Sequence, residues 1–277
     1  MIKNKTKLLT IRKFVRIFVL LFVLFIFFGF IEPLSITHYD YTSDKIPKDF
    51  DGYKIVQLSD FHCKGFGMEE DVLINKIKKS SPDLIVLTGD FIDGAENHSI
   101  DTVETLFEGI SYIAPTYFVT GNDEYYSHAP FEEMDLLFER YQITYLKNKT
   151  VDINLNGSTI KLSGLDDSGY KTNIKEILGP ADTNYYNILL FHRSDCFDFV
   201  SNYKYDLVLS GHTHGGIVRL PFIGGVFGNE NVMFPEYDHG QFQNNSSTLI
   251  SSSGLGKSSI PRFYNPYEVV RITLQSE

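Results

Sequence analysis

The chain has 277 residues, of which 43% are hydrophobic and 22% charged, as is ordinary for a folded globular protein. Its net charge of −10 argues against a nucleic-acid backbone as the main partner, because phosphates repel an acidic surface. Two cysteines, Cys63 and Cys196, are too few for a disulfide scaffold, and the sequence leaves open whether they lie close together. We therefore expect one globular domain and no nucleic-acid partner.

The N-terminal segment differs from the acidic body that follows it. Its first sixteen residues carry six Lys and Arg side chains and no acid, and an uninterrupted apolar run then extends from Ile17 to Ile31. This pattern is typical of an uncleaved signal anchor that crosses the cell membrane once, with its basic end in the cytoplasm. A cleaved signal peptide is the alternative, although no small-residue cleavage site follows. We predict a cytoplasmic segment at 1–16, a transmembrane helix at 17–34, a linker with a short strand at 35–49 and an extracytoplasmic domain at 50–277.

The first half of the domain alternates buried strands with amphipathic helices. Apolar, β-branched runs predict strands at 53–59, 84–89 and 116–121. Helical periodicity predicts helices at 68–80, from 102 to before Pro115, and at 131–141. This alternation predicts a largely parallel sheet with helices on its face.

The second half is rich in short strand patterns. Asn156-Gly157 between two alternating runs predicts a β-hairpin, and buried strands return at 187–192 and 205–211. The runs after Gly216, including 268–275, are expected to belong to a second sheet. The predicted fold class is α/β, a layered sandwich of two mixed β-sheets flanked by helices and preceded by one N-terminal transmembrane helix.

Metal-ligand side chains occur where five of the predicted strands end. They are Asp60, His62, Asp90, Asn122, His192, His212 and His214. Strand ends followed by turns are where open α/β sheets assemble their sites. Each of these residues alone is more often a turn, cap or surface residue. Together, Asp, Asn and His suit two adjacent divalent cations, the machinery of phosphate-ester hydrolysis.

These motifs carry a family resemblance. In order and context, Asp60-x-His62, Gly89-Asp90, Gly121-Asn122, His192 and Gly211-His212-x-His214 resemble the calcineurin-like metallophosphoesterases. The stretches GHTHGGIVRLPFIGG, FPEYDHGQF and SSGLGKSSIPRF look like one bacterial branch of that family. It comprises small membrane-associated proteins of the YkuE/YaeI type, related to the UDP-2,3-diacylglucosamine pyrophosphatases. The resemblance spans roughly residues 53–275 and implies the sandwich fold of that family.

The resemblance also implies a role for each ligand. Asp60, His62 and His214 would hold one ion, Asn122, His192 and His212 the other, and Asp90 would bridge the two. The mixed oxygen and nitrogen set favours Mn²⁺, with Fe or Zn²⁺ as alternatives. The implied activity is metal-dependent hydrolysis of a phosphoester or pyrophosphate bond, with a lipid-linked or cell-envelope phosphoester as the favoured substrate.

One position departs from the family pattern. Relatives have a histidine directly after the Gly-Asn pair, and it is thought to assist the leaving group, whereas this chain has Asp123. Asp123 and the nearby His128 are the candidates for this catalytic role. Arg262, which follows a Gly-rich loop, is a candidate substrate contact, with a tight strand connection as the alternative. The departure leaves a second function open, a catalytically weakened metal-binding or regulatory module.

Overall fold

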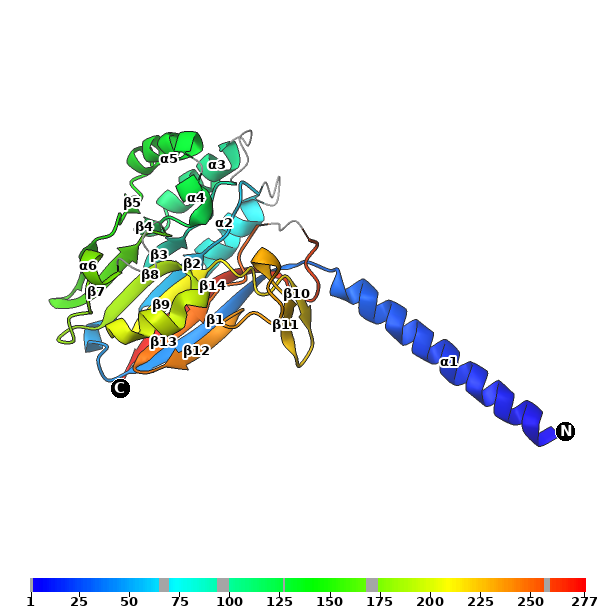
Figure 1. Cartoon of the computed structure of the whole chain (residues 1–277). Helices are drawn as coiled ribbons and strands as arrows, with labels where there is room; N and C mark the ends of the chain where they lie inside the picture. Colours follow the sequence, from blue (N-terminus) through cyan, green and yellow to red (C-terminus); the bar gives the residue numbers. More distant parts are fainter. Residues whose placement is uncertain (1, 65–69, 94–99, 127, 168–173, 257–259) are drawn as a thin grey trace.

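The structure is a computed structural model, and it describes residues 2–64, 70–93, 100–126, 128–167, 174–256 and 260–277. Figure 1 shows a sandwich of β-sheets with helices around it, from which one N-terminal helix projects. The first sheet has six strands in the order β1-β14-β2-β3-β4-β5. These strands are β1 (Leu34–Ser43), β14 (Tyr267–Ser276), β2 (Lys54–Leu58), β3 (Leu84–Thr88), β4 (Thr116–Val119) and β5 (Thr144–Tyr145).

The second sheet also has six strands, in the order β12-β13-β9-β8-β7-β6. Its strands are β12 (Gly240–Asn244), β13 (Ser247–Ser251), β9 (Leu207–Gly211), β8 (Asn187–Arg193), β7 (Ser158–Leu165) and β6 (Thr150–Leu155). Both sheets are mixed, because antiparallel pairs join otherwise parallel strands. Two further strands, β10 (Val218–Leu220) and β11 (Gly224–Phe227), form a separate hairpin. The predicted α/β sandwich of two mixed sheets is therefore confirmed.

Three apolar clusters hold the layers together. Alternate residues of β2 point to opposite faces, so Ile55 packs between the two sheets while Val56 and Leu58 face helices. The helices on that outer face are α2 (Glu70–Lys79), α3 (Asp101–Ser111) and α5 (His128–Arg140). The outer face of the second sheet packs against the short helices α6 (Ile174–Ile177) and α7 (Phe197–Val200).

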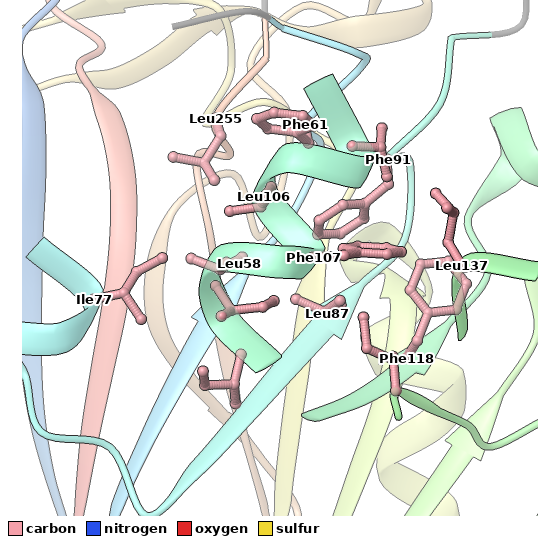
Figure 2. Packing of buried hydrophobic residues seen from close by; sticks show 14 of the residues in the cluster. Leu58, Phe61, Ile77, Leu87, Phe91, Leu106, Phe107, Phe118, Leu137 and Leu255 are labelled. Atoms are coloured by element: carbon pink, nitrogen blue, oxygen red, sulfur yellow. The ribbon is translucent and has the colours of Figure 1, made fainter. Parts of the chain in front are cut away.

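Aromatic packing in the outer cluster reaches the segments that carry predicted ligands. Phe61 lies between Asp60 and His62 in the chain, and Phe91 follows Asp90. Both phenylalanines are fully buried, with ring centroids 5.9 Å apart, and Figure 2 shows them beside Phe107. Burial of such rings stabilises the backbone that carries the polar side chains on either side.

Two predictions for the second half have opposite outcomes. The hairpin at Asn156-Gly157 is confirmed, since β6 and β7 pair antiparallel with Leu155 opposite Ser158. The assignment of 268–275 to the second sheet is wrong, because β14 pairs antiparallel with β2 and parallel with β1 in the first sheet. An alternating pattern identifies a strand but carries no information about its neighbours. The predicted linker segment contains β1, the edge strand of this sheet.

The predicted transmembrane helix requires a correction. Helix α1 (Ile2–Gly29) forms, and its end rests on the body, where the Tyr264 hydroxyl donates to the Phe25 carbonyl at 2.8 Å. No helix in the described part of the chain is both long and apolar enough to span a bilayer. The physical reason is that Arg16 and the cations before it leave only a short uncharged stretch of helix, whereas a span needs about 20 apolar residues. The prediction of a single-pass cell-membrane protein with an extracytoplasmic domain is contradicted by this finding.

Candidate metal centre

The seven predicted ligands meet at one edge of the sandwich. All lie near or just after the carboxyl end of a strand. Asp60 and His62 follow β2, Asp90 follows β3, Asn122 follows β4, His192 is the second-last residue of β8, and His212 and His214 follow β9. Strands β2, β3 and β4 are parallel neighbours, as are β8 and β9, so their carboxyl ends reach the same rim. Figure 1 shows these strands of the two sheets lying close together.

One cluster consists of Asp60, His62 and His214. One ligand atom from each lies within 4.8 Å of the others. The Nε2 atoms of the two histidines are 3.2 Å apart, and His214 Nε2 lies 3.6 Å from Asp60 Oδ1. Nitrogen ligands bound to one ion at about 2.0–2.1 Å are separated by a similar distance, so this spacing suits a shared cation.

A second cluster consists of Asp90, His192 and His212, again within 4.8 Å of one another. Asp90 Oδ2 lies 3.1 Å from His192 Nε2 and 4.0 Å from His62 Nε2, so this carboxylate stands between the two clusters. The Oδ1 atom of Asn122 is buried and has no hydrogen-bond partner among the described residues. An unpaired buried oxygen is costly, and a cation would satisfy it.

Hydrogen bonds fix which nitrogen two of the histidines present. His192 Nδ1 lies 2.7 Å from the Thr88 carbonyl, which can only accept, so Nδ1 carries the proton. His62 Nδ1 lies 3.1 Å from Asp123 Oδ2 and donates in the same way. Each ring therefore directs its Nε2 toward its cluster, and this nitrogen can bind a metal ion once it carries no proton.

The backbone at the clusters adopts a rarely occupied conformation. Positive φ angles between 49° and 75° occur at Asp60, His62, Asp90, His212 and His214. Only a few per cent of non-glycine residues have such angles, and those that do concentrate at functional sites. The turns also need close approach, since a Cβ at Gly121 would collide with the Asp90 carboxylate and one at Gly211 with that of Asp60.

Glu124 is a buried residue of the site that the sequence analysis did not single out. Its carboxylate accepts backbone N–H bonds from Asp90 at 2.8 Å, Phe91 at 2.6 Å, Ile92 at 3.2 Å and Gly121 at 2.7 Å. Glu124 thus joins the turn after β3 to the turn after β4. Its position two residues after Asn122 indicated that it lies near the site, but the sequence does not show that its carboxylate points into the protein interior.

The carboxylates and histidines of the clusters shift one another's pKa values. Burial alone would lower the pKa of His62 and His192, but neighbouring carboxylates, above all Asp123 and Asp90, raise these values to about 9 and about 10. Burial raises the pKa of Asp60 and, together with the charge of Asp90, that of Glu124, which reaches about 7. A divalent cation would stabilise these buried carboxylates in their charged form.

The three remaining predicted site residues differ in what surrounds them. Asp123 contacts His62 and Asn122 at the edge of the site. His128 begins helix α5, and its side chain lies outside the described part of the structure. Arg262 is 1% exposed and donates from Nε and Nη2 to the Gly256 carbonyl, so its contact with substrate stays a prediction.

Arg193 is a further charged residue at the site that the sequence analysis did not include. It follows His192 in β8, and Asp167 accepts from its Nε at 2.6 Å and its Nη2 at 3.2 Å. Its Nη1 lies 3.0 Å from His212 Nε2. The Arg193 guanidinium, paired with both carboxylate oxygens of Asp167, therefore lies at the edge of the second cluster. Cys63 and Cys196, by contrast, are not joined by a disulfide and pack in different apolar clusters.

Glu268 in β14 anchors the loop at Ser253-Gly254, which lies against Asp60. Its buried carboxylate accepts from the Ser253 N–H at 2.8 Å and from the Thr37 hydroxyl, and it lies 2.8 Å from His239 Nε2. Burial alone would raise the pKa of Glu268, but the bond and charge of His239 and the bonds from Thr37 and Ser253 lower it below its usual 4.5.

We expect this anchor to make stability depend on pH. A carboxyl group with a depressed folded pKa stabilises the protein above its unfolded pKa, and this contribution is lost as the pH falls through the folded value. The free energy of unfolding should therefore fall as the medium is acidified below about pH 4.5, and Glu268→Gln should lower it at neutral pH by about 1.5–3 kcal/mol. Urea unfolding at neutral and acidic pH measures both effects, with the exposed Glu139→Gln as control. Equal pH dependence in wild type and Glu268→Gln would contradict this role.

Comparisons with known proteins identify the family of this chain. The model of the calcineurin-like phosphoesterase family matches residues 53–216. The chain is 32% identical to the uncharacterized metallophosphoesterase YkuE of Bacillus subtilis, over 89% of this chain and 88% of that protein. It is 31% identical to an uncharacterized metallophosphoesterase of Aquifex aeolicus, over 88% of this chain and 93% of that protein. Among solved structures, TT1561 of Thermus thermophilus has a TM-score of 0.47 at 13% identity, covering 73% of this chain and 89% of that one.

The chain belongs to the calcineurin-like phosphoesterase family. This family is dinuclear and metal-dependent, and the two clusters described above are candidate sites for its two ions.

Proposed function

We propose that the protein is a dinuclear metal-dependent phosphoesterase. The observation that carries this proposal is the position of Asp90 between two clusters of metal-ligand residues. Asp60, His62 and His214 would hold one ion, Asn122, His192 and His212 the second, and Asp90 both. When bound, such a pair supplies the Lewis acidity for hydrolysis of a phosphate ester at neutral pH. We propose Mn²⁺ as the ion that this site prefers, because carboxylate, amide and imidazole donors suit it.

The protein's own residues contribute orientation and charge. Thr88 and Asp123 hold the rings of His192 and His62, so these ligands are in place before substrate arrives. Arg193, held by Asp167, offers a planar guanidinium at the rim, a group that pairs well with phosphate oxygens.

A cavity beside His212 supports a substrate with a partly apolar leaving group. It has a volume of about 250 Å³, and besides His212 it is lined by two apolar residues, Val232 and Pro235, and by the polar or acidic residues Asp195, Thr213, Asn229 and Glu236. We propose phosphodiester or pyrophosphate cleavage here, with a lipid-linked or cell-envelope phosphoester as substrate. Rates on phosphodiesters with short and long alkyl chains test this, since an apolar contact should favour the longer chain.

The proposal is tested by turnover of bis-p-nitrophenyl phosphate. Purified full-length protein with added Mn²⁺ should release p-nitrophenol, lose this activity with a chelator and regain it when Mn²⁺ returns. The second candidate, a weakened metal-binding or regulatory module, is favoured by Asp123 in the family's histidine position. Binding of two ions without turnover of any phosphoester offered would establish that module and overturn the hydrolase.

A further inference from the structure

Asp123 touches three of the proposed metal ligands at once. Its Oδ2 lies 3.1 Å from His62 Nδ1, and its Oδ1 accepts from Asn122 Nδ2 at 2.8 Å. Its backbone N–H donates to Asp90 Oδ1 at 2.9 Å. The side chain is 23% exposed and sits in the first turn of helix α4 (Asn122–Tyr126). The residue therefore connects ligands that follow β2, β3 and β4.

We infer that Asp123 is a positioning residue that orients His62 and Asn122 toward the two ions, an inference that rests on the proposed function. A carboxylate on the outer nitrogen of a ligating histidine fixes its tautomer and raises the basicity of the other nitrogen. The bond from Asn122 Nδ2 likewise turns the amide so that its Oδ1, which is buried, faces away from Asp123. One carboxylate thus orients one ligand of each ion.

The same contacts argue against Asp123 as the proton donor in the family's histidine position. Both carboxylate oxygens already accept hydrogen bonds from N–H groups of the proposed ligands, so both are engaged in holding those ligands. Asp93 offers a further carboxylate oxygen within 4.8 Å of His62 and Asp123. Negative charge along the outer edge of the imidazole strengthens its role as a nitrogen donor.

Metal affinity tests the inference without relying on turnover. Full-length protein, stripped of metal, is titrated with Co²⁺, and Asp123→Ala should bind it about 10–100-fold more weakly than wild type. Asp123→Asn keeps one carbonyl oxygen, which can accept a hydrogen bond from His62 or from Asn122 but not from both. Its affinity for Co²⁺ should therefore fall less than that of Asp123→Ala. Asp123→His, which restores the family residue but no acceptor pair, should behave like Asp123→Ala. Glu139→Gln, which removes the same charge from exposed α5, should bind as wild type does.

A spectroscopic signal separates positioning from general damage. In the Co²⁺-loaded protein, the ring N–H of a ligating histidine gives a shifted proton resonance, and Asp123 should protect that of His62 from exchange with water. Asp123→Asn should keep this signal and Asp123→Ala should lose it, while the ring N–H of His192, bound to Thr88, stays in both. Unchanged Co²⁺ affinity and an unchanged His62 signal in Asp123→Ala would overturn the inference. Wild-type protein that binds no Co²⁺ would instead overturn the proposed function.

Discussion

Replacing Asp90 with alanine should abolish phosphoester hydrolysis and leave fewer than two ions bound. Asp90 belongs to the second cluster, and its Oδ2 atom also lies 4.0 Å from the Nε2 atom of His62 in the first cluster. Without it, neither ion would keep its full ligand set or its spacing to the other. Removing a residue that only hydrogen-bonds to a metal ligand typically lowers metal affinity or activity by about 10–100-fold. Removing a ligand shared by both ions should therefore lower them by more than about 100-fold.

Two further variants make this expectation specific. Asp90→Asn keeps the shape and one acceptor oxygen but loses the charge, so it should retain more metal than Asp90→Ala and still hydrolyse poorly. Glu139→Gln removes an exposed carboxylate on α5 and should act as wild type does. Metal analysis and turnover of bis-p-nitrophenyl phosphate are measured on the same preparations. A folded Asp90→Ala protein with two ions and full activity would refute the bridging assignment.

Glu124→Ala should cause the largest loss of stability of any substitution at this site. The change leaves the N–H groups of Asp90, Phe91 and Gly121 without their buried acceptor. Each unsatisfied buried donor costs about 1–3 kcal/mol, and because solvent will reach some of them, we expect a total loss of about 3–5 kcal/mol. Urea unfolding of wild type and variant measures this loss directly.

Glu124→Gln serves as the matched variant for this prediction. It keeps one oxygen as an acceptor but brings an NH₂ group toward backbone N–H donors, so it should cost about 1–3 kcal/mol. Both variants should also weaken metal binding, because the turns that carry Asp90 and Asn122 lose their common anchor. A loss of less than 1 kcal/mol in Glu124→Ala would show that water replaces the carboxylate without penalty.

The sequence predicted the architecture around the site better than the contacts within it. Strand ends are visible as apolar runs, and parallel neighbours place their carboxyl ends at one rim, so Asp60, Asp90 and Asn122 could be expected to meet. The turn at Asn156-Gly157 could be predicted because its chemistry is local.

Non-local relations could not be predicted in this way. The place of β14 between β1 and β2 depends on pairings over long sequence separations, which no local pattern encodes. The inward direction of the Glu124 carboxylate and the contact between Asp123 and His62 depend on the fold of two turns. The apolar run from Ile17 predicted a membrane span, but the cations near it leave helix α1 without a sufficiently long apolar stretch.

The most direct test of the dinuclear site is electron paramagnetic resonance of the Mn²⁺-loaded protein. If Asp90 holds two ions between the clusters, their spins should couple and give the multiline spectrum of a bridged pair, which Asp90→Ala should lose. The spectrum of isolated Mn²⁺ in the fully loaded wild-type protein would show that the two clusters do not share a carboxylate, and would contradict the proposed dinuclear site.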